Sequence, residues 1–202
     1  VQVLILQKRE EATSSDGKFI FEVNNKKIFV PEESKRLLES LYQDSFSLRE
    51  LGFEVKTGGV VWNQNKEFLS WDESKVRLIW SHNIVNNKLF LYKEGQHKKP
   101  QYVAAHPPIK LLGLVSTSDA IVVNRIVGSG VNSKVRATVI NDKLPWVAEN
   151  HVNIIYPLPG EKQLISIDEV HRQLTSRRMA KVLSLVSCNT QLSKNELEGF
   201  LP

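Results

Sequence analysis

Two acidic residues and a lysine in the first third of the chain have the residue types that metal-dependent nucleases use. Asp44 lies ten residues before Glu54, and Lys56 follows Glu54 by two positions. In such nucleases two carboxylates hold a divalent cation while a lysine helps to position the attacking water. Thr57-Gly58-Gly59 follows, and a basic turn rich in glycine also fits a phosphate held by backbone amides and by Lys56. The sequence leaves both interpretations open and favours the phosphate-holding turn.

Two loops are similar to methyltransferase or cofactor motifs but lack the residues that these motifs need. His106-Pro107-Pro108-Ile109 is similar to the Asn-Pro-Pro-Tyr loop of amino-methyltransferases. In that loop a side-chain amide accepts a hydrogen bond from the target amine, and an aromatic ring stacks on the flipped base. Gly128-Ser129-Gly130 lacks the acidic-glycine strand turn of a cofactor cradle, and we interpret it as a flexible tip near phosphate. We therefore predict that this chain holds no catalytic and no cofactor-binding residue.

Basic and polar residues in the second half of the chain are suited to contacts with DNA. Arg125, Lys134 and Arg136 lie along a predicted hairpin, and arginine can form paired hydrogen bonds to guanine or to phosphate. The alternative is a solvated hairpin without a partner. Asn150 and His151 directly precede a predicted strand, where the histidine fits a structural hydrogen bond and a DNA contact equally well. The five histidines form no close cluster in the sequence, so we predict no metal site.

Positive charge is concentrated in the middle of the chain. The net charge is +5, and residues 75–140 contain ten lysines or arginines but only two acidic residues. Such a distribution attracts polyanions, and counterion release makes the binding to phosphate backbones dependent on salt. We expect these cations to share one surface that receives a double helix.

The periodicity of apolar residues and the turn signals predict an α+β fold with curved antiparallel sheets in the middle. A hairpin around residues 24–26 and a helix from Pro31 open the chain. Capping boxes predict a short helix from Ser47 to Gly52, a helix from Ser166 to about Val186, and a last helix from Ser193. The short β-like runs of the middle part are residues 76–80, 89–92, 121–123, 135–140 and 152–155.

We interpret the chain as one domain in three parts. Residues 1–52 form a strand-and-helix entry segment, residues 53–160 the β-rich recognition part, and residues 161–202 the helical end. The apolar runs are too short to cross a bilayer, and Cys188 is the only cysteine, which fits a reducing cytoplasm. The chain starts with Val1 rather than methionine, inside the predicted strand at residues 3–6, so we expect it to be part of a longer protein.

Four short motifs occur in the order found in a known family. They are Gly52–Gly58 with Val61–Asn63, Leu78–Trp80 with Asn83–Ile84, Val147–Ile155, and Cys188–Leu197. The series resembles the C-terminal target-recognition part of Eco57I-like adenine-specific DNA methyltransferases of restriction-modification systems. The resemblance covers roughly residues 48–202. Cys188 stands where the family often has glycine, and residues 96–108 match nothing in the family pattern.

The resemblance implies a parent enzyme that transfers a methyl group from S-adenosylmethionine to the exocyclic amine of adenine. In such enzymes an N-terminal domain binds the cofactor and the flipped base, while the C-terminal part grips the duplex and reads its sequence. Carried over to this chain, it implies DNA contacts at Lys56, Thr57, Gly58, Arg125, Asn150, His151, Asn189, Thr190 and Gln191. The hairpin residues Lys134 and Arg136 join these candidates because of their charge.

The leading hypothesis is therefore a target-recognition domain that binds double-stranded DNA beside a catalytic methyltransferase domain in cis, without a membrane. It predicts S-adenosylmethionine in the parent enzyme and no cofactor in this chain. Two alternatives remain. The first is a metal-dependent nuclease domain that uses Asp44, Glu54 and Lys56. The second is a protein-interaction module that docks on a methyltransferase or nuclease subunit.

Overall fold

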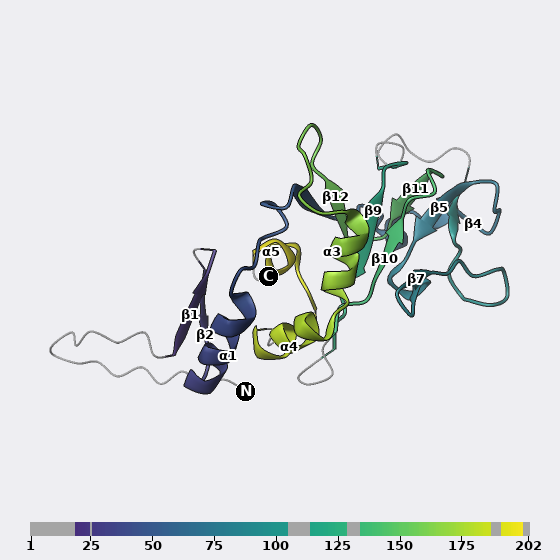
Figure 1. Cartoon of the computed structure of the whole chain (residues 1–202). Coiled ribbons are helices and arrows are strands. Elements are labelled where there is room, and N and C mark those ends of the chain that lie inside the picture. Colours follow the sequence, from purple (N-terminus) through teal and green to yellow (C-terminus); the bar gives the residue numbers. More distant parts are fainter. Residues whose placement is uncertain (1–18, 25, 105–113, 129–133, 187–190, 200–202) are drawn as a thin grey trace.

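A four-stranded antiparallel sheet forms the middle layer of the molecule. The computed structural model describes residues 19–24, 26–104, 114–128, 134–186 and 191–199 (Figure 1). In this central sheet the strand order is β10-β9-β12-β3. The strands are β3 (Phe53–Thr57), β9 (Ala120–Asn124), β10 (Ala137–Ile140) and β12 (Val152–Pro157). The predicted α+β class with largely antiparallel sheets is confirmed.

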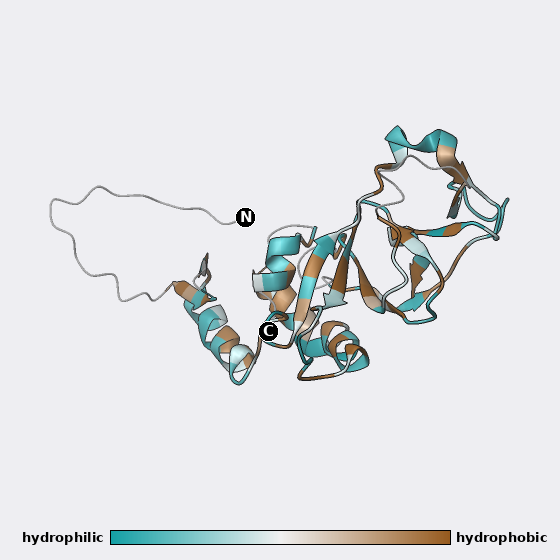
Figure 2. Ribbon diagram, turned by 90° about the horizontal axis from the view of Figure 1, so that it is seen from above, coloured by the Kyte–Doolittle hydropathy of each residue, from teal (hydrophilic) through white to brown (hydrophobic). Residues whose placement is uncertain are grey.

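Both faces of the central sheet are buried, because successive side chains of a strand point to opposite faces. In β9, Ile121 and Val123 belong to the apolar cluster that also contains Leu174 and Leu183 of the C-terminal helices. Val122, on the other face, packs in a cluster with Ile79 of a second sheet. The fold thus has three layers: helices, the central sheet and the second sheet. Figure 2 shows the matching concentration of apolar residues on the strands.

Three helices cover the first face of the central sheet: α3 (Ile167–Leu174), α4 (Arg177–Val186) and α5 (Lys194–Gly199). The prediction of one continuous helix as far as Val186 is wrong. The hydroxyl of Thr175 donates to the carbonyl of His171 at 2.9 Å, and the hydroxyl of Ser176 accepts from the amide of Met179 at 3.1 Å. These side chains compete with the helical backbone pattern, so the chain stops and restarts as α4.

The second sheet has the order β11-β5-β8-β4, and its β11–β5 pair is parallel. Its strands are β4 (Leu69–Ser70), β5 (Val76–Ile79), β8 (Tyr102–Val103) and β11 (Trp146–Ala148). Between them lie the short 3-10 helices η1 (Trp62–Gln64), η2 (Lys66–Phe68) and η3 (Ser81–Asn83), and the hairpin β6 (Ile84–Val85) and β7 (Lys88–Leu89). The predicted strand at residues 89–92 is wrong beyond Leu89, where the chain becomes irregular.

The N-terminal hairpin and helix lie at the left of Figure 1, apart from the sheets. They are β1 (Ile20–Val23), β2 (Lys26–Phe29) and α1 (Glu32–Tyr42), as the sequence predicts. Phe21, Val30 and Leu38 form their buried cluster, against which Val186 of α4 packs. The predicted helix after Ser47 is wrong: both hydrogen bonds of the Ser47–Glu50 capping box are present, but they close an isolated turn.

Several sequence predictions fall outside the described residues: the strand at residues 3–6, the loop 106–109 and the tip residues 129 and 130. In the part of the chain that the structure describes, no helix has the length and hydrophobicity needed to cross a membrane.

Candidate nucleic-acid interface

The register of the central sheet brings predicted site residues from separate segments to one end of the sheet. Asn153 of β12 pairs with Thr57 of β3 on one side and with Val123 of β9 on the other. Val123 also pairs with Ala137, the first residue of β10. The end of β3, the end of β9 and the beginnings of β10 and β12 therefore meet. We call this region the polar sheet end and define it as Thr57, Arg125, Lys134, Arg136, Asn150, His151, Asn153 and Gln191.

A chain of hydrogen bonds ties the polar sheet end to the segment before α5. The hydroxyl of Thr57 donates to Asn153 Oδ1 at 3.1 Å, and Asn153 Nδ2 donates to the carbonyl of Leu192 at 3.0 Å. The amide of Leu192 in turn donates to the carbonyl of Arg125 at 2.6 Å. Gln191 is exposed beside Ile126, with which it forms an isolated β-bridge. The predicted residues Asn189 and Thr190 lie outside the described part of the chain.

The three cations of the hairpin, Arg125, Lys134 and Arg136, differ in their exposure and in their hydrogen bonds to the rest of the chain. Arg125 Nη1 donates to the carbonyl of Asn150 at 3.0 Å, whereas Lys134 and Arg136 are exposed. The side chain of Arg136 donates to the carbonyl of Ile126 at 3.3 Å. Arg125 Nε and Asn150 Oδ1 are buried and have no hydrogen-bond partner within the described residues. The site therefore contains one buried donor and one buried acceptor that no described residue satisfies, which is uncommon for buried polar groups.

A buried carboxylate orients the histidine of the polar sheet end. Glu149 is only 1% exposed, and its two oxygens accept from the amide of His151 at 2.9 Å and from His151 Nδ1 at 2.6 Å. Because the carboxylate accepts this bond, Nδ1 carries a hydrogen and the ring orientation is fixed. The side chain of His151 remains 53% exposed. The structural interpretation of His151 therefore holds for Nδ1, and a DNA contact through the exposed side of the ring stays a prediction.

Sequence reasoning missed Glu149 and Asn153 as positioning residues. Both are buried, and both hold side chains or segments of the polar sheet end in place. A signal was present, because both flank the predicted residues Asn150 and His151. An acidic residue and an amide directly before and inside an apolar strand require hydrogen-bond partners when buried.

Lys56 and Gly58 do not form the predicted phosphate-holding turn. The amide of Gly58 donates to the carbonyl of Val152 at 2.9 Å, so the sheet already uses it. Lys56 points to the face opposite that of Val55, and its ammonium lies 2.7 Å from a carboxylate oxygen of Glu54. There it lines a groove of about 740 Å³ with Tyr156, whose ring centroid is 5.4 Å from the ammonium.

The described cations of residues 75–140 do not share one surface, contrary to the expectation from the sequence. Arg77 is 8% exposed and forms two hydrogen bonds to the carboxylate of Asp142, at 2.6 and 2.7 Å. Lys75 pairs with Asp72, and Lys99 lies over tryptophan rings of the second sheet. The three hairpin cations at the polar sheet end form the group that the register brings together.

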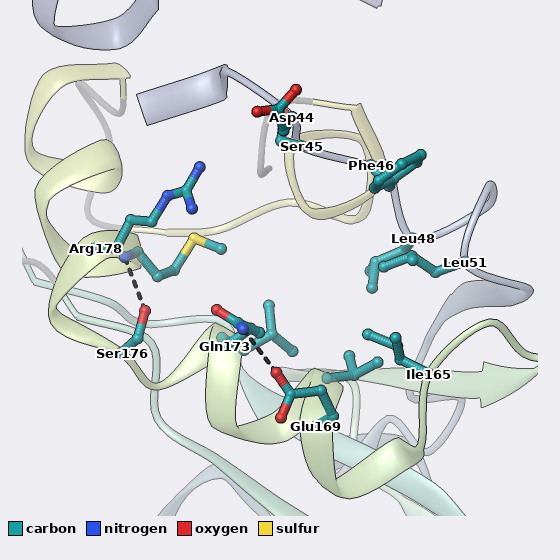
Figure 3. A pocket seen from close by; sticks show the side chains of 13 residues that line it. Asp44, Ser45, Phe46, Leu48, Leu51, Ile165, Glu169, Gln173, Ser176 and Arg178 are labelled. Atoms are coloured by element: carbon teal, nitrogen blue, oxygen red, sulfur yellow. Dashed lines mark hydrogen bonds between the residues drawn. The ribbon is translucent and has the colours of Figure 1, made fainter. Parts of the chain in front are cut away.

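The residues of the alternative nuclease site lie in different surroundings. Asp44 lines an apolar cavity of about 220 Å³ between residues 44–51 and helices α3 and α4 (Figure 3). Glu54 pairs with Lys56 on the far side of β3. Among the described residues, no group of three or more histidine, cysteine or acidic side chains has the arrangement of a metal site.

No protein-family model matches this chain, and no curated protein matches it either.

Proposed function

We propose that this chain binds a specific sequence of duplex DNA as the target-recognition domain of an S-adenosylmethionine-dependent, adenine-specific DNA methyltransferase of a restriction-modification system. The observation that carries the proposal is the gathering of Arg125, Lys134, Arg136 and His151 at one end of a rigid sheet. In DNA-binding proteins cationic side chains set the register on phosphates, and a few oriented polar groups read base edges.

The polar sheet end has the two kinds of group that this function needs. Lys134 and Arg136 are exposed cations two positions apart on the approach to β10, which suits contacts with successive phosphates. His151 is held by Glu149 and the side chain of Arg125 by the carbonyl of Asn150, which limits their freedom and favours base-specific hydrogen bonds. The family resemblance adds that a catalytic domain in cis would act on the adenine.

A binding experiment tests the proposal. Duplexes bound by the chain are enriched from a randomised library, and fluorescence polarisation then compares the enriched duplex with a scrambled one. We expect tighter binding of the enriched duplex and an affinity that falls steeply as salt rises. The double variant Lys134→Glu/Arg136→Glu should lose at least tenfold in affinity, since two phosphate contacts become repulsive.

The matched control carries the same change in charge elsewhere. Arg36 lies on α1, and Lys162 lies beside Gly52, at the end of β3 opposite to Thr57; both are exposed. Arg36→Glu/Lys162→Glu should retain most of the affinity. Equal losses in the two double variants would mean that only net charge matters, and absence of binding at low salt would refute duplex recognition.

A further inference from the structure

Six aromatic rings of the second sheet and its loops form one continuous cluster. They come from η1, from η3 with the residue before it, and from the irregular chain between β7 and β8. We call this cluster the aromatic array; its members are Trp62, Trp80, His82, Phe90, Tyr92 and His97. It includes part of the stretch 96–108, which the proposed function leaves unexplained.

Stacked contacts run through the array. The rings of His82 and His97 are 3.8 Å apart at an angle of 22°, and His82 stacks on Trp80 at 5.6 Å and 24°. Tyr92 lies 5.1 Å from His97, and Phe90 packs edge-on against Tyr92 at 4.9 Å. Phe90 ends the series and is 48% exposed. An exposed aromatic ring on a fixed stack presents a surface for a further flat ring.

Two lysines lie over rings of the array. The ammonium of Lys99 lies 4.7 Å from the ring centroid of Trp62 and 4.4 Å from that of Trp80, and Lys66 lies 4.7 Å from Trp62. None of Lys66, Lys93, Lys98 and Lys99 has an ion pair with another described residue. By contrast, Lys56, Lys75 and Lys143 each pair with a carboxylate. The charge around the array is therefore left for an anion.

Hydrogen bonds from the buried side chains of Trp80 and Gln101 hold the array in place. Trp80 Nε1 donates to the carbonyl of Pro100 at 2.9 Å, and Gln101 Nε2 donates to the carbonyl of Lys99 at 2.8 Å. Burial, with the charges of His97 and Lys99, lowers the pKa of His82 to about 4. His82 is therefore a neutral stacking ring at neutral pH, and Lys66 and Lys99 bring positive charge to the array.

We propose that the aromatic array binds single-stranded DNA, stacking an unpaired base on Phe90 while the neighbouring lysines contact the phosphates. Aromatic rings interleaved with cations are the combination that binds single strands with little sequence preference. The array lies near the polar sheet end, because Asn124, next to Arg125, donates from Nδ2 to the carbonyl of Ser81, between Trp80 and His82, at 3.5 Å. A strand that leaves a duplex at the polar sheet end would meet the array next. The array's own binding does not depend on that duplex interface.

Fluorescence anisotropy with a short labelled oligothymidylate tests this site. We expect the intact chain to bind at low salt and Phe90→Ala to weaken binding roughly tenfold, the effect of one lost stacking contact. Phe90→Tyr keeps an aromatic ring and should keep the affinity. Phe90→Leu keeps the apolar volume without the ring and should lose affinity. Phe46 is 54% exposed beside the cavity of Figure 3, so Phe46→Ala is the matched control and should bind like the parent chain.

The outcomes separate this proposal from the proposed duplex function. Lys93→Gln/Lys98→Gln should reduce the salt dependence of oligothymidylate binding. Equal affinity of Phe90→Ala and Phe46→Ala, or no binding by the intact chain at low salt, overturns the array site. Binding of oligothymidylate without binding of any duplex overturns the duplex function and leaves the array site standing. Loss of duplex binding alone in Lys134→Glu/Arg136→Glu supports two separate sites.

Discussion

The polar sheet end and the interior of the second sheet are both organised by a fully buried asparagine, yet the two networks differ. Asn153 joins Thr57 to the carbonyl of Leu192, and each of these partners lies in a different segment of the chain. Asn83 lies among buried groups: its Oδ1 accepts from the amide of Trp80 at 2.7 Å, and its Nδ2 donates to the carbonyl of Phe90 and to Gln101 Oε1.

The difference separates a candidate site from a structural core. The network of Asn83 and Gln101 replaces backbone ladders in a sheet whose strands contain as few as two residues, so both amides have become part of the interior. At the polar sheet end the strands already pair through their backbones. The side-chain hydrogen bonds there include those of Thr57 and His151, which are exposed to solvent. Closed networks determine a fold, whereas networks that open to solvent leave groups free to bind.

The largest expected loss of stability comes from a substitution that breaks the contact between Gly58 and Glu149, which joins the two regions. Gly58 lies so close to the backbone of Glu149 that an added Cβ would be 2.1 Å from its carbonyl oxygen. We expect Gly58→Ala to lower the free energy of unfolding by about 4 kcal/mol, because two backbone segments must separate. Urea denaturation measures the loss. Gly95 has open space around it but a φ of +84°, so Gly95→Ala should cost only about 1 kcal/mol. Equal losses would contradict the close approach.

The next effect tests the closed network. Asn83→Leu would leave the amide of Trp80, the carbonyl of Phe90 and Gln101 Oε1 without their partner. We expect a loss of about 3 kcal/mol in the free energy of unfolding, measured by urea denaturation. Asn150 is the control from the polar sheet end: its Oδ1 has no partner within the described residues, so Asn150→Leu should cost less than about 1 kcal/mol. Similar losses would remove the distinction between the two networks.

Much of the fold can be predicted from local sequence signals, and the features that the sequence does not predict depend on residues far apart in the chain. The hairpin turn at Asn24, which has a φ of 49°, and the cap at Ser193 depend on residues within three positions, so the sequence predicts them. The burial of Arg77 depends on Asp142, 65 residues away, and no local pattern reveals that pairing. The polar residues near β12 are likewise visible in the sequence, but the strand register that brings them together is not.

A smaller effect is the pH dependence of stability that His82 gives to the second sheet but not to the polar sheet end. The pKa of His82 falls from 6.5 to about 4 in the folded state, mainly through burial. The unfolded state then binds more protons between these values, so the stabilising contribution is present above pH 6.5 and is lost as the pH falls towards 4. Since His82 is only half buried, we expect this loss to be about 1 kcal/mol after solvent screening. Comparing acid-dependent denaturation of the parent chain with His82→Gln isolates it, and parallel curves would contradict the prediction.

The smallest effect tests whether the polar sheet end is an open network. Thr57→Val keeps the shape of the side chain but removes the donor to Asn153 Oδ1. Because Thr57 is exposed, water can replace the lost hydrogen bond, and we expect a cost of only about 0.5 kcal/mol. Thr57→Ser keeps the hydroxyl and should show the stability of the parent chain in the same urea titration.

The same variant should affect binding more than stability. Asn153 also donates to the carbonyl of Leu192. Greater freedom of the Asn153 side chain would therefore also loosen the segment that carries Gln191. If this segment contacts DNA, Thr57→Val should weaken duplex binding by a few-fold, and Thr57→Ser should not. A loss of stability near 3 kcal/mol with unchanged binding would place Thr57 in a closed structural network, and the polar sheet end would then resemble the interior of the second sheet.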